Sequence, residues 1–300
     1  MIGLGSTGRA LVAWRWLSYN IGDRANGSSP SGKDMMTSSR DKDVQDEAAS
    51  RLASSFGFRD VQPDDKASMV GDVFARVADR YDVMNDLMSG GVHRLWKASL
   101  VDVLSPRPGI RMVDVAGGTG DIAFRVLDRL KGKDGPPSAI TVSDINPAML
   151  GVGRDRAIDQ NRLAGIDWIT ADAERLPLKT ASMDAYTIAF GIRNVTRIDR
   201  ALAEACRVLK PGGRFLCLEF SALQWEQLRP IYDAYSFNVV PWLGERIADD
   251  RDAYQYLVES IRRFPDQVTF AGMIEAAGLT RVRCRNMTGG VAALHSAWRI

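Results

Sequence analysis

Val113-Asp114-Val115-Ala116-Gly117-Gly118-Thr119-Gly120-Asp121 is the stretch around which the rest of the chain is organised. Apolar, β-branched residues lead to a carboxylate, three glycines follow, and a helical apolar pattern begins directly after them. Glycine lets the backbone turn sharply and lets a ligand come close, while the amides of a helix's first turn are free to donate hydrogen bonds. The stretch therefore predicts a strand, a tight turn and a helix N-terminus that hold a nucleotide-like cofactor.

The glycine loop alone does not decide which cofactor this is. Gly118-Thr119-Gly120-Asp121-Ile122-Ala123 fits the G-x-G-x-x-A variant of the dinucleotide-binding fingerprint. A glycine-rich turn with only a structural role is the simpler alternative, because short motifs match by chance. The residues that follow the other strands must therefore separate these interpretations.

The composition limits the class of protein to which the chain can belong and the partners that it can have. A chain of 300 residues with 45% hydrophobic residues can bury one large α/β core or two small ones. Its 39 basic and 37 acidic residues leave a net charge of +2, which gives no electrostatic reason to expect nucleic acid as a partner. The three cysteines form no C-x-x-C pair, so they indicate neither a zinc site nor a disulfide framework, and a reducing compartment fits best. No apolar run is long enough to span a bilayer, so any membrane contact is expected to be peripheral.

The first part of the chain differs in character from the rest. Residues 1–60 are rich in Gly, Ser and charged residues without lasting apolar periodicity, and we predict a mostly disordered N-terminal extension. The segment 1–22 carries arginines and a short apolar cluster but no acid, as a mitochondrial transit peptide does. Met35 and Met36 open a second plausible N-terminus, and the sequence favours an over-long start over a transit peptide.

A helical pattern precedes the glycine loop. Apolar residues recur at helical spacing from Lys66 to Ala78, Gly90-Gly91 interrupts the pattern, and a second helix runs through Leu104 to the first of two prolines. Helices packed in front of a glycine loop can cover a ligand. We therefore predict an N-terminal helical lid over residues 66–105.

Strands and helices alternate after the loop. Further strands are expected at 139–144, 166–170, 185–190 and 214–220, with helices at 149–158 and 198–209. Such alternation is typical of a parallel sheet with helices on both faces. Residues 222–264 are rich in aromatic side chains with little strand character, and we interpret them as a substrate cap.

The end of the chain departs from the parallel pattern. A helix over 268–277 is followed by two strands, 280–285 and 291–300, and Met287-Thr288-Gly289-Gly290 is short enough to join them as an antiparallel hairpin. The fold class expected is α/β and Rossmann-like: one domain over 61–300, with a central mostly parallel sheet, an antiparallel C-terminal hairpin and helices on both faces.

The residues at the C-terminal ends of the strands narrow the choice of cofactor. Ligands of open parallel sheets lie beyond these ends. Asp144 ends the second strand and can accept hydrogen bonds from two ribose hydroxyls. Asp172 can accept from an adenine amino group while Ala173 leaves room for the ring. A dinucleotide would need a second glycine loop, which the sequence lacks, and its fold would not need the closing hairpin.

Taken together, these motifs resemble the class I S-adenosylmethionine-dependent methyltransferases. The evidence comprises Asp114 with Gly118-Thr119-Gly120, Asp144, Asp172-Ala173, and the helix stop Val208–Arg214. Outside the cofactor loop the chain is similar to the family that methylates a ring carbon in ubiquinone and menaquinone biosynthesis, over residues 56–300. Four stretches carry this narrower resemblance: Phe74–Lys97, Phe190–Val195, Tyr232–Phe237 and Tyr256–Arg262.

The resemblance implies both substrate and cofactor. It implies C-methylation of 2-polyprenyl-6-methoxy-1,4-benzoquinol, and in some members of demethylmenaquinol, with S-adenosylmethionine as methyl donor. The candidate cofactor-binding residues are Asp114, Gly118, Thr119, Gly120, Asp144, Asp172 and Ala173. No metal is implied. Many members carry Ser where this chain has Ala189, which would remove one neutral hydrogen bond to the cofactor, about 1 kcal/mol.

Methyl transfer to carbon needs an aligned ring carbon, some phenolate character, and a base for the ring proton. Arg193 is suited to hold quinolate charge or a water, because its guanidinium stays protonated. Asn194 can orient the second oxygen, and Tyr81, Asp82 and His93 are base candidates. The alternatives are structural, since a tyrosine at a helix end is often packed and a histidine can cap its helix.

Two other functions stay open at this point. One is a class I O- or N-methyltransferase of another small molecule, and the other is a catalytically idle assembly subunit of a quinone-biosynthesis complex. The aromatic cap could line a tunnel for an isoprenoid tail or face a membrane, so we expect peripheral membrane contact. A homodimer or a quinone-biosynthesis complex is left open. The expected location is the bacterial cytoplasm at the inner face of the membrane, or the matrix side of the mitochondrial inner membrane if residues 1–35 are a transit peptide.

Overall fold

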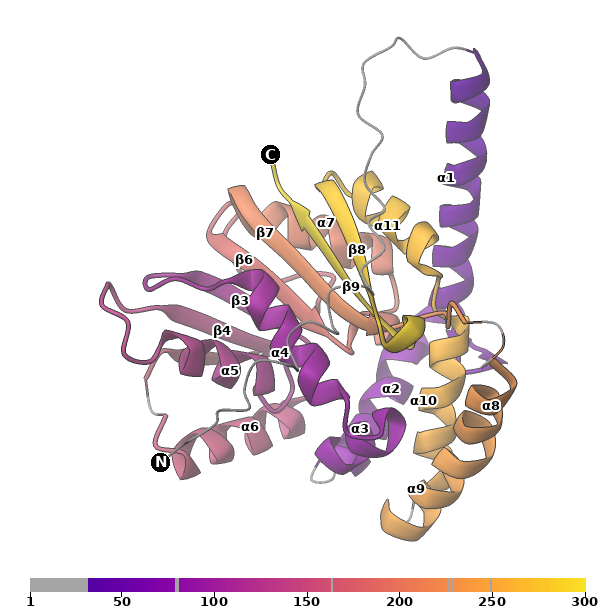
Figure 1. Cartoon of the computed structure of the whole chain (residues 1–300), viewed down its shortest axis with the longest axis horizontal. Coiled ribbons are helices and arrows are strands. Elements are labelled where there is room, and N and C mark those ends of the chain that lie inside the picture. The colour runs from indigo at the N-terminus through magenta and orange to yellow at the C-terminus, as the bar shows by residue number, and fades with distance from the viewer. Residues whose placement is uncertain (1–31, 79–80, 163, 226, 228, 249) are drawn as a thin grey trace, which may run out of the picture.

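The computed structural model describes residues 32–78, 81–162, 164–225, 227, 229–248 and 250–300. Its centre is a seven-stranded sheet in the order β5-β4-β3-β6-β7-β9-β8 (Figure 1). The strands are β3 (Arg111–Val115), β4 (Ala139–Asp144), β5 (Ile166–Thr170), β6 (Met183–Ala189), β7 (Leu209–Phe220), β8 (Thr280–Met287) and β9 (Ala292–Trp298). The strands from β3 to β7 pair in parallel, whereas β9 runs antiparallel to both β7 and β8. The predicted fold class is confirmed.

The sheet is buried between two layers of helices. One layer includes α4 (His93–Leu104), α5 (Asp121–Leu130) and α6 (Pro147–Asp159), and the other includes α7 (Ile198–Val208) and α11 (Gln267–Ala276) (Figure 1). Strands covered on both faces need apolar side chains throughout. β7 accordingly ends in a run that is almost wholly buried, and it begins at Leu209 rather than at the predicted Arg214 because Leu209 pairs with Met183 of β6.

The N-terminal region differs from the prediction. Instead of disorder up to residue 60, helix α1 (Gly32–Ala53) packs beside α11 and α7, followed by the short strands β1 (Ser55–Phe56) and β2 (Arg59–Asp60) (Figure 1). Leu52 is 2% exposed, and the Nζ atom of Lys66 donates to its carbonyl at 2.6 Å. The sequence of this helix has little apolar periodicity, so the pattern did not predict a helix here. The predictions on residues 1–31 lie outside the described residues.

The segment predicted as a lid contains three helices. α2 (Pro63–Val77) and α3 (Tyr81–Ser89) precede α4, and Gly90 and Gly91 follow α3 with positive φ angles of 58° and 78°. The aromatic segment forms α8 (Arg229–Ala234), a π-helix (Tyr235–Val239), α9 (Val240–Ala248) and α10 (Arg251–Arg263), and α10 contacts α2. Within the described parts of the chain, no helix has the length and apolar character needed to cross a membrane.

Candidate functional site

A cavity opens at the C-terminal ends of β3, β4 and β6. Its walls come from α2 (Ala67 to Phe74), the residues directly after these three strands, and the two loops 171–174 and 194–196. The strand order turns here, because β4 and β6 leave β3 in opposite directions. Open α/β sheets bind their ligands at such a switch point. The helix predicted to open the lid therefore does form one wall of the cavity.

The glycine turn has the backbone that its sequence predicts. Gly118 and Gly120 adopt positive φ angles of 50° and 79°. A Cβ atom at Gly118 would lie 2.9 Å from the Cε atom of Met149 and 3.7 Å from a carboxylate oxygen of Asp144. Gly120 is the N-cap of α5 and supplies no side-chain cap, so the first-turn amides of that helix are left to other acceptors. The turn is thus closely fitted around Asp144.

Asp144, the last residue of β4, lines the cavity. Its two carboxylate oxygens accept from the amides of Gly118 and Asn146, each at 2.9 Å. Burial raises the pKa of this carboxyl to about 6. Asn146 caps α6, and its side-chain amide donates to the carbonyl of Gly71 in α2 at 3.1 Å. One short segment therefore fixes both the predicted ribose-binding carboxylate and the helix that covers it.

Asp172 and Ala173 lie in the cavity wall at the start of the loop that follows β5. The carboxylate of Asp172 accepts from the amide of Glu174 at 2.9 Å, which makes a local turn, and Ala173 is buried. Glu174 in turn accepts from the amide of Arg197 at 2.8 Å. The loop is thereby tied to the start of α7.

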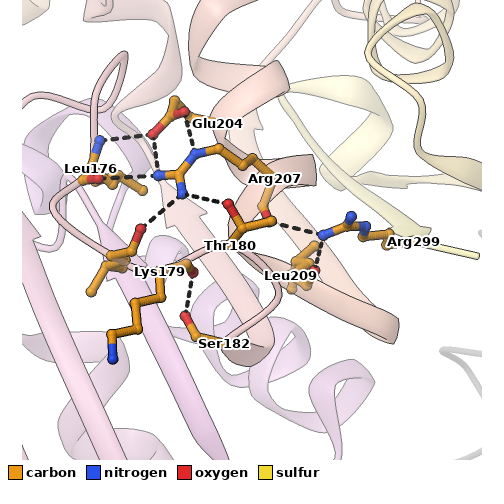
Figure 2. A network of polar contacts seen from close by, with 9 residues as sticks. Leu176, Lys179, Thr180, Ser182, Glu204, Arg207, Leu209 and Arg299 are labelled. Carbon is orange, nitrogen blue, oxygen red and sulfur yellow. Dashed lines mark hydrogen bonds and ion pairs between the residues drawn. The ribbon is translucent and has the colours of Figure 1, made fainter.

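The continuation of this loop is anchored by a buttress on α7, formed by Glu204 and Arg207 (Figure 2). The guanidinium of Arg207 makes two parallel 2.7 Å bonds to the carboxylate of Glu204 and donates to the carbonyls of Leu176 and Leu178 at 3.1 and 2.8 Å. The same carboxylate accepts from the amide of Leu176 at 2.9 Å. Such bidentate, charge-assisted pairs are strong and directional. The buttress fixes the loop that begins with Asp172.

A second, smaller cavity lies at the glycine turn. Thr119, Ala189 and Asp114 line it together with Lys97 and Asp121. Asp114 is 1% exposed; one of its oxygens accepts from Thr187 at 2.7 Å, and the other has no hydrogen-bond partner among the described residues. Burial raises the pKa of the Asp114 carboxyl to about 7. A serine in place of Ala189 would stand in this cavity.

Arg193 does not occupy the place that the sequence suggested. It is 2% exposed and does not line either cavity. Its Nη1 atom donates to Glu219 and to the carbonyl of Phe190, each at 2.7 Å, and its Nε atom donates to Ser260 at 3.3 Å. Phe190 has a positive φ of 60°, which is strained for a residue with a Cβ atom. Arg193 thus holds the turn after β6 instead of facing the cavity.

Asn194 does line the large cavity. Its side-chain oxygen accepts from the hydroxyl of Tyr256 on α10 at 3.0 Å. Tyr256 stacks on Phe56 with ring centroids 4.2 Å apart, so this hydroxyl is held firmly. The side-chain amide nitrogen of Asn194 is left as a donor for a ligand.

Only one of the three base candidates can be placed. The side chains of Tyr81 and Asp82 lie outside the described residues. His93 is buried at the start of α4, with its Nε2 atom 2.9 Å from Asp86; in the part of the chain that the structure describes, its Nδ1 atom has no partner. Burial lowers the pKa of His93. It does not line the large cavity, so its part in proton removal stays a prediction.

Two charged residues of the site were not identified from the sequence. Lys97 follows His93 by one helical turn, and Glu219 stands near the end of β7 much as Asp144 ends β4. Applying the rule of strand-end carboxylates to every strand would have identified Glu219. Nothing in the local pattern distinguishes Lys97 from a lysine on a solvated helix face.

The comparisons with known proteins agree on one family. The ubiE/COQ5 methyltransferase family matches residues 61–299. The chain is 58% identical to "Ubiquinone/menaquinone biosynthesis C-methyltransferase UbiE" of Paracoccus denitrificans, over 82% of this chain and 96% of that protein. It is 59% identical to the protein of the same name from Methylobacterium nodulans, over 84% and 99% of the two chains. A SAM-dependent methyltransferase from Thermotoga maritima has the same fold, with a TM-score of 0.52 at 18% identity over 77% of this chain and all of that one (100%).

Proposed function

The chain belongs to the ubiE/COQ5 methyltransferase family, and on that premise we propose that it methylates a ring carbon of 2-polyprenyl-6-methoxy-1,4-benzoquinol, with demethylmenaquinol as the second candidate substrate. It is a C-methyltransferase of ubiquinone/menaquinone biosynthesis that depends on S-adenosylmethionine. The observation that carries the proposal is the cavity at the switch point, where strand-end carboxylates stand beside the apolar wall of α2. The carboxylates match the hydroxyl and amino donors of a nucleoside, and the apolar wall matches a substrate ring.

The residues around the two cavities fit S-adenosylmethionine. Asp144 would accept from the ribose hydroxyls and Asp172 from the adenine amino group, with Ala173 beneath the ring. Thr119 and the glycine turn would follow the methionine part. The unpartnered, buried oxygen of Asp114 supports this fit, because such an oxygen is costly unless a ligand donates to it. When bound, the cofactor supplies an electrophilic methyl group on a sulfonium sulfur.

The protein's own groups position and deprotonate the quinol. Asn194 would donate to a quinol oxygen and stabilise its phenolate character, which makes the adjacent ring carbon nucleophilic. The ring carbon would take the methyl group as the bond from that group to sulfur breaks, with the electron pair left on sulfur as a thioether. The methylated carbon would then lose its hydrogen as a proton to a base, for which Tyr81, Asp82 and His93 remain the candidates. Arg193 acts as a positioning residue, since with Glu219 it holds the Phe190 turn that precedes Asn194.

We further propose peripheral contact with the inner face of a bacterial membrane. Val239 and Trp242 are exposed large apolar residues at the π-helix and α9, and the guanidinium of Arg246 lies 4.9 Å from the Trp242 ring. Tryptophan and arginine suit the boundary between lipid headgroups and acyl chains. The substrate's isoprenoid tail resides in the membrane, which supports this placement. The relatives described above are bacterial.

Turnover by the purified protein tests the function. With S-adenosylmethionine and a short-tailed demethyl quinol, we expect a singly methylated quinol by mass spectrometry. Arg193→Ala should lower the rate by at least tenfold, because the turn before Asn194 loses its support. In cells, loss of quinone with the variant protein still present would exclude the idle assembly subunit. Normal quinone levels with that variant, or absence of product from the wild type, would overturn the proposal.

A further inference from the structure

Lys66 is a buried cation on α2, the helix that forms one wall of the large cavity. It is 1% exposed, and the next residue, Ala67, lines the cavity. Its Nζ atom donates to the carbonyls of Leu52 at 2.6 Å and of Val195 at 3.3 Å. Burial lowers the pKa of this amine to about 8, although the charge of Glu174 acts in the opposite direction. Burying an ammonium group is costly, so an aliphatic side chain would suit this place better unless the two carbonyls need a donor.

One of the two carbonyls belongs to the cavity wall. Val195 follows the short 3-10 helix Ile192–Asn194, and both Asn194 and Val195 line the large cavity. The amide of Val195 donates to the carbonyl of Ile192 at 3.2 Å, so Val195 closes the turn that carries Asn194. Lys66 therefore holds the end of the turn that presents the Asn194 amide to the cavity.

The other carbonyl belongs to the last turn of α1, which leads into β1. Leu52 of α1 and Phe56 of β1 are both buried. Phe56 stacks on Tyr256, whose hydroxyl donates to the side chain of Asn194 at 3.0 Å. The N-terminal segment 52–56 thus reaches the Asn194 turn by two routes, through Lys66 to its backbone and through Tyr256 to its side chain. Two points of attachment fix an orientation that one would leave free to rotate.

We propose that Lys66 is a positioning residue for the quinol, because its bonds to Leu52 and Val195 hold the Asn194 turn against the N-terminal segment 52–56. The proposal rests on the proposed function, in which Asn194 donates to a quinol oxygen. The cofactor side of the cavity is held by other contacts: Asp144 accepts from two amides, and the buttress on α7 fixes the loop after β5. Lys66 therefore acts on the quinol and leaves the cofactor site in place.

Loss of Lys66 should separate turnover from cofactor binding. Without its donor the Asn194 turn can shift, and a misplacement of about 1 Å can cost about a hundredfold in rate. Affinity for S-adenosylhomocysteine should stay the same. A lysine that only stabilised the fold would behave differently, since its loss would lower the free energy of unfolding and leave turnover per folded molecule unchanged.

Steady-state kinetics and titration calorimetry on the full chain test this. Lys66→Met should lower kcat with a short-tailed demethyl quinol by about tenfold or more, and bind S-adenosylhomocysteine within about twofold of the wild type. The calorimetric stoichiometry counts folded sites, so unfolded protein does not enter kcat. Lys66→Gln is close to Met in size and keeps N–H donors, but its chain is one bond shorter than that of lysine. Its kcat should lie between those of Lys66→Met and the wild type.

Ser55→Ala is the matched control. It removes a 3.2 Å hydrogen bond to the same Leu52 carbonyl and leaves Lys66 to hold both carbonyls, so it should turn over as the wild type does.

Three results would overturn the role of Lys66: wild-type kcat in either Lys66 variant, an equal loss in both variants, or a loss of cofactor affinity as large as the loss of kcat. An equal loss would mean that the shape of the side chain matters and its donors do not. If the wild type methylates the quinol and the Lys66 variants match it, only this inference fails. If the wild type forms no methylated quinol, the proposed function itself fails.

Discussion

Asp144 was predicted as a cofactor-binding residue, and the structure adds detail to that prediction. A carboxylate at the end of the second core strand indicated a ribose contact, and the structure places it in the cavity wall. The sequence could not show that the Gly118 and Asn146 amides already donate to it, or that burial raises its pKa to about 6. Its ionisation is therefore within reach of a modest change in pH.

We predict that cofactor affinity falls as the solution is acidified through pH 6. The raised pKa means that Asp144 is neutral below about 6 and ionised above it, and ribose hydroxyls donate best to the ionised form. Binding should release a proton, with affinity for S-adenosylhomocysteine dropping toward roughly tenfold per pH unit below 6. Calorimetry from pH 5 to 8 measures this.

Asp144→Asn serves as the reference for this prediction. It should bind more weakly at neutral pH and lose the part of the pH dependence that comes from Asp144, leaving that of Asp114, whose pKa is raised to about 7. An unchanged pH profile in the variant would remove Asp144 from the cofactor site.

Arg193 marks the limit of residue-level prediction. Its position after the fourth core strand suggested a charge facing the substrate, but its partners Glu219 and Ser260 lie 26 and 67 residues further along the chain. No local pattern pairs residues at such separations. The side chain that does line the cavity, Asn194, was predicted because it directly follows.

At the scale of elements, the strands were the easiest to predict. β4 and β5 have the expected bounds because β-branched and apolar residues fill them and turn residues flank them. α1 was missed because its sequence is mostly polar; in the part of the helix whose burial is described, residues 41–53, the buried Ala48 and Leu52 are spread among polar residues. The Glu204–Arg207 buttress was invisible because a charged pair one turn apart usually lies on a solvated face.

The buttress leads to a prediction for α7 and the loop after β5. Arg207→Met removes five hydrogen bonds from one guanidinium and leaves Glu204 without its cation, so we expect a loss of about 2–3 kcal/mol in the free energy of unfolding. Affinity for S-adenosylhomocysteine should fall as well, because the loop carries Asp172. Urea denaturation and calorimetry measure the two effects.

Two further variants sharpen this test. Arg207→Lys keeps the charge but cannot reproduce the bidentate pair, and should give an intermediate loss. Arg200→Met removes an exposed arginine from the same helix and should change neither quantity. A stable Arg207→Met protein with normal affinity would show that the loop holds its shape without the buttress.

At the scale of the whole molecule, the fold class could be predicted from the alternation of strands and helices and from the closing hairpin. The arrangement of the helical cap could not be predicted in this way. Residues 222–264 were recognised as an aromatic cap, but their π-helix and the contact of α10 with α2 depend on tertiary packing. Such packing overrides local propensity, so only the structure shows which apolar residues remain exposed.

The exposed side chain of Trp242 predicts which face of the molecule contacts a membrane. Co-flotation with vesicles containing anionic lipid should recover the wild type, and Trp242→Ser should reduce the bound fraction severalfold because a buried indole is lost from the lipid boundary. Val268→Ser alters an exposed residue on α11 and is the matched control. Equal flotation of all three proteins would rule out the α9 face as the membrane contact.

Deuterium on the substrate ring tests methylation at carbon most directly. Purified enzyme is given S-adenosylmethionine and a short-tailed quinol that carries deuterium at the ring position to be methylated, and the product is analysed by mass spectrometry. We expect a product that has gained a methyl group and lost the deuterium, because the ring carbon exchanges its hydrogen for the methyl group. A methylated product that retains the deuterium would contradict it, since the methyl group would then be on oxygen.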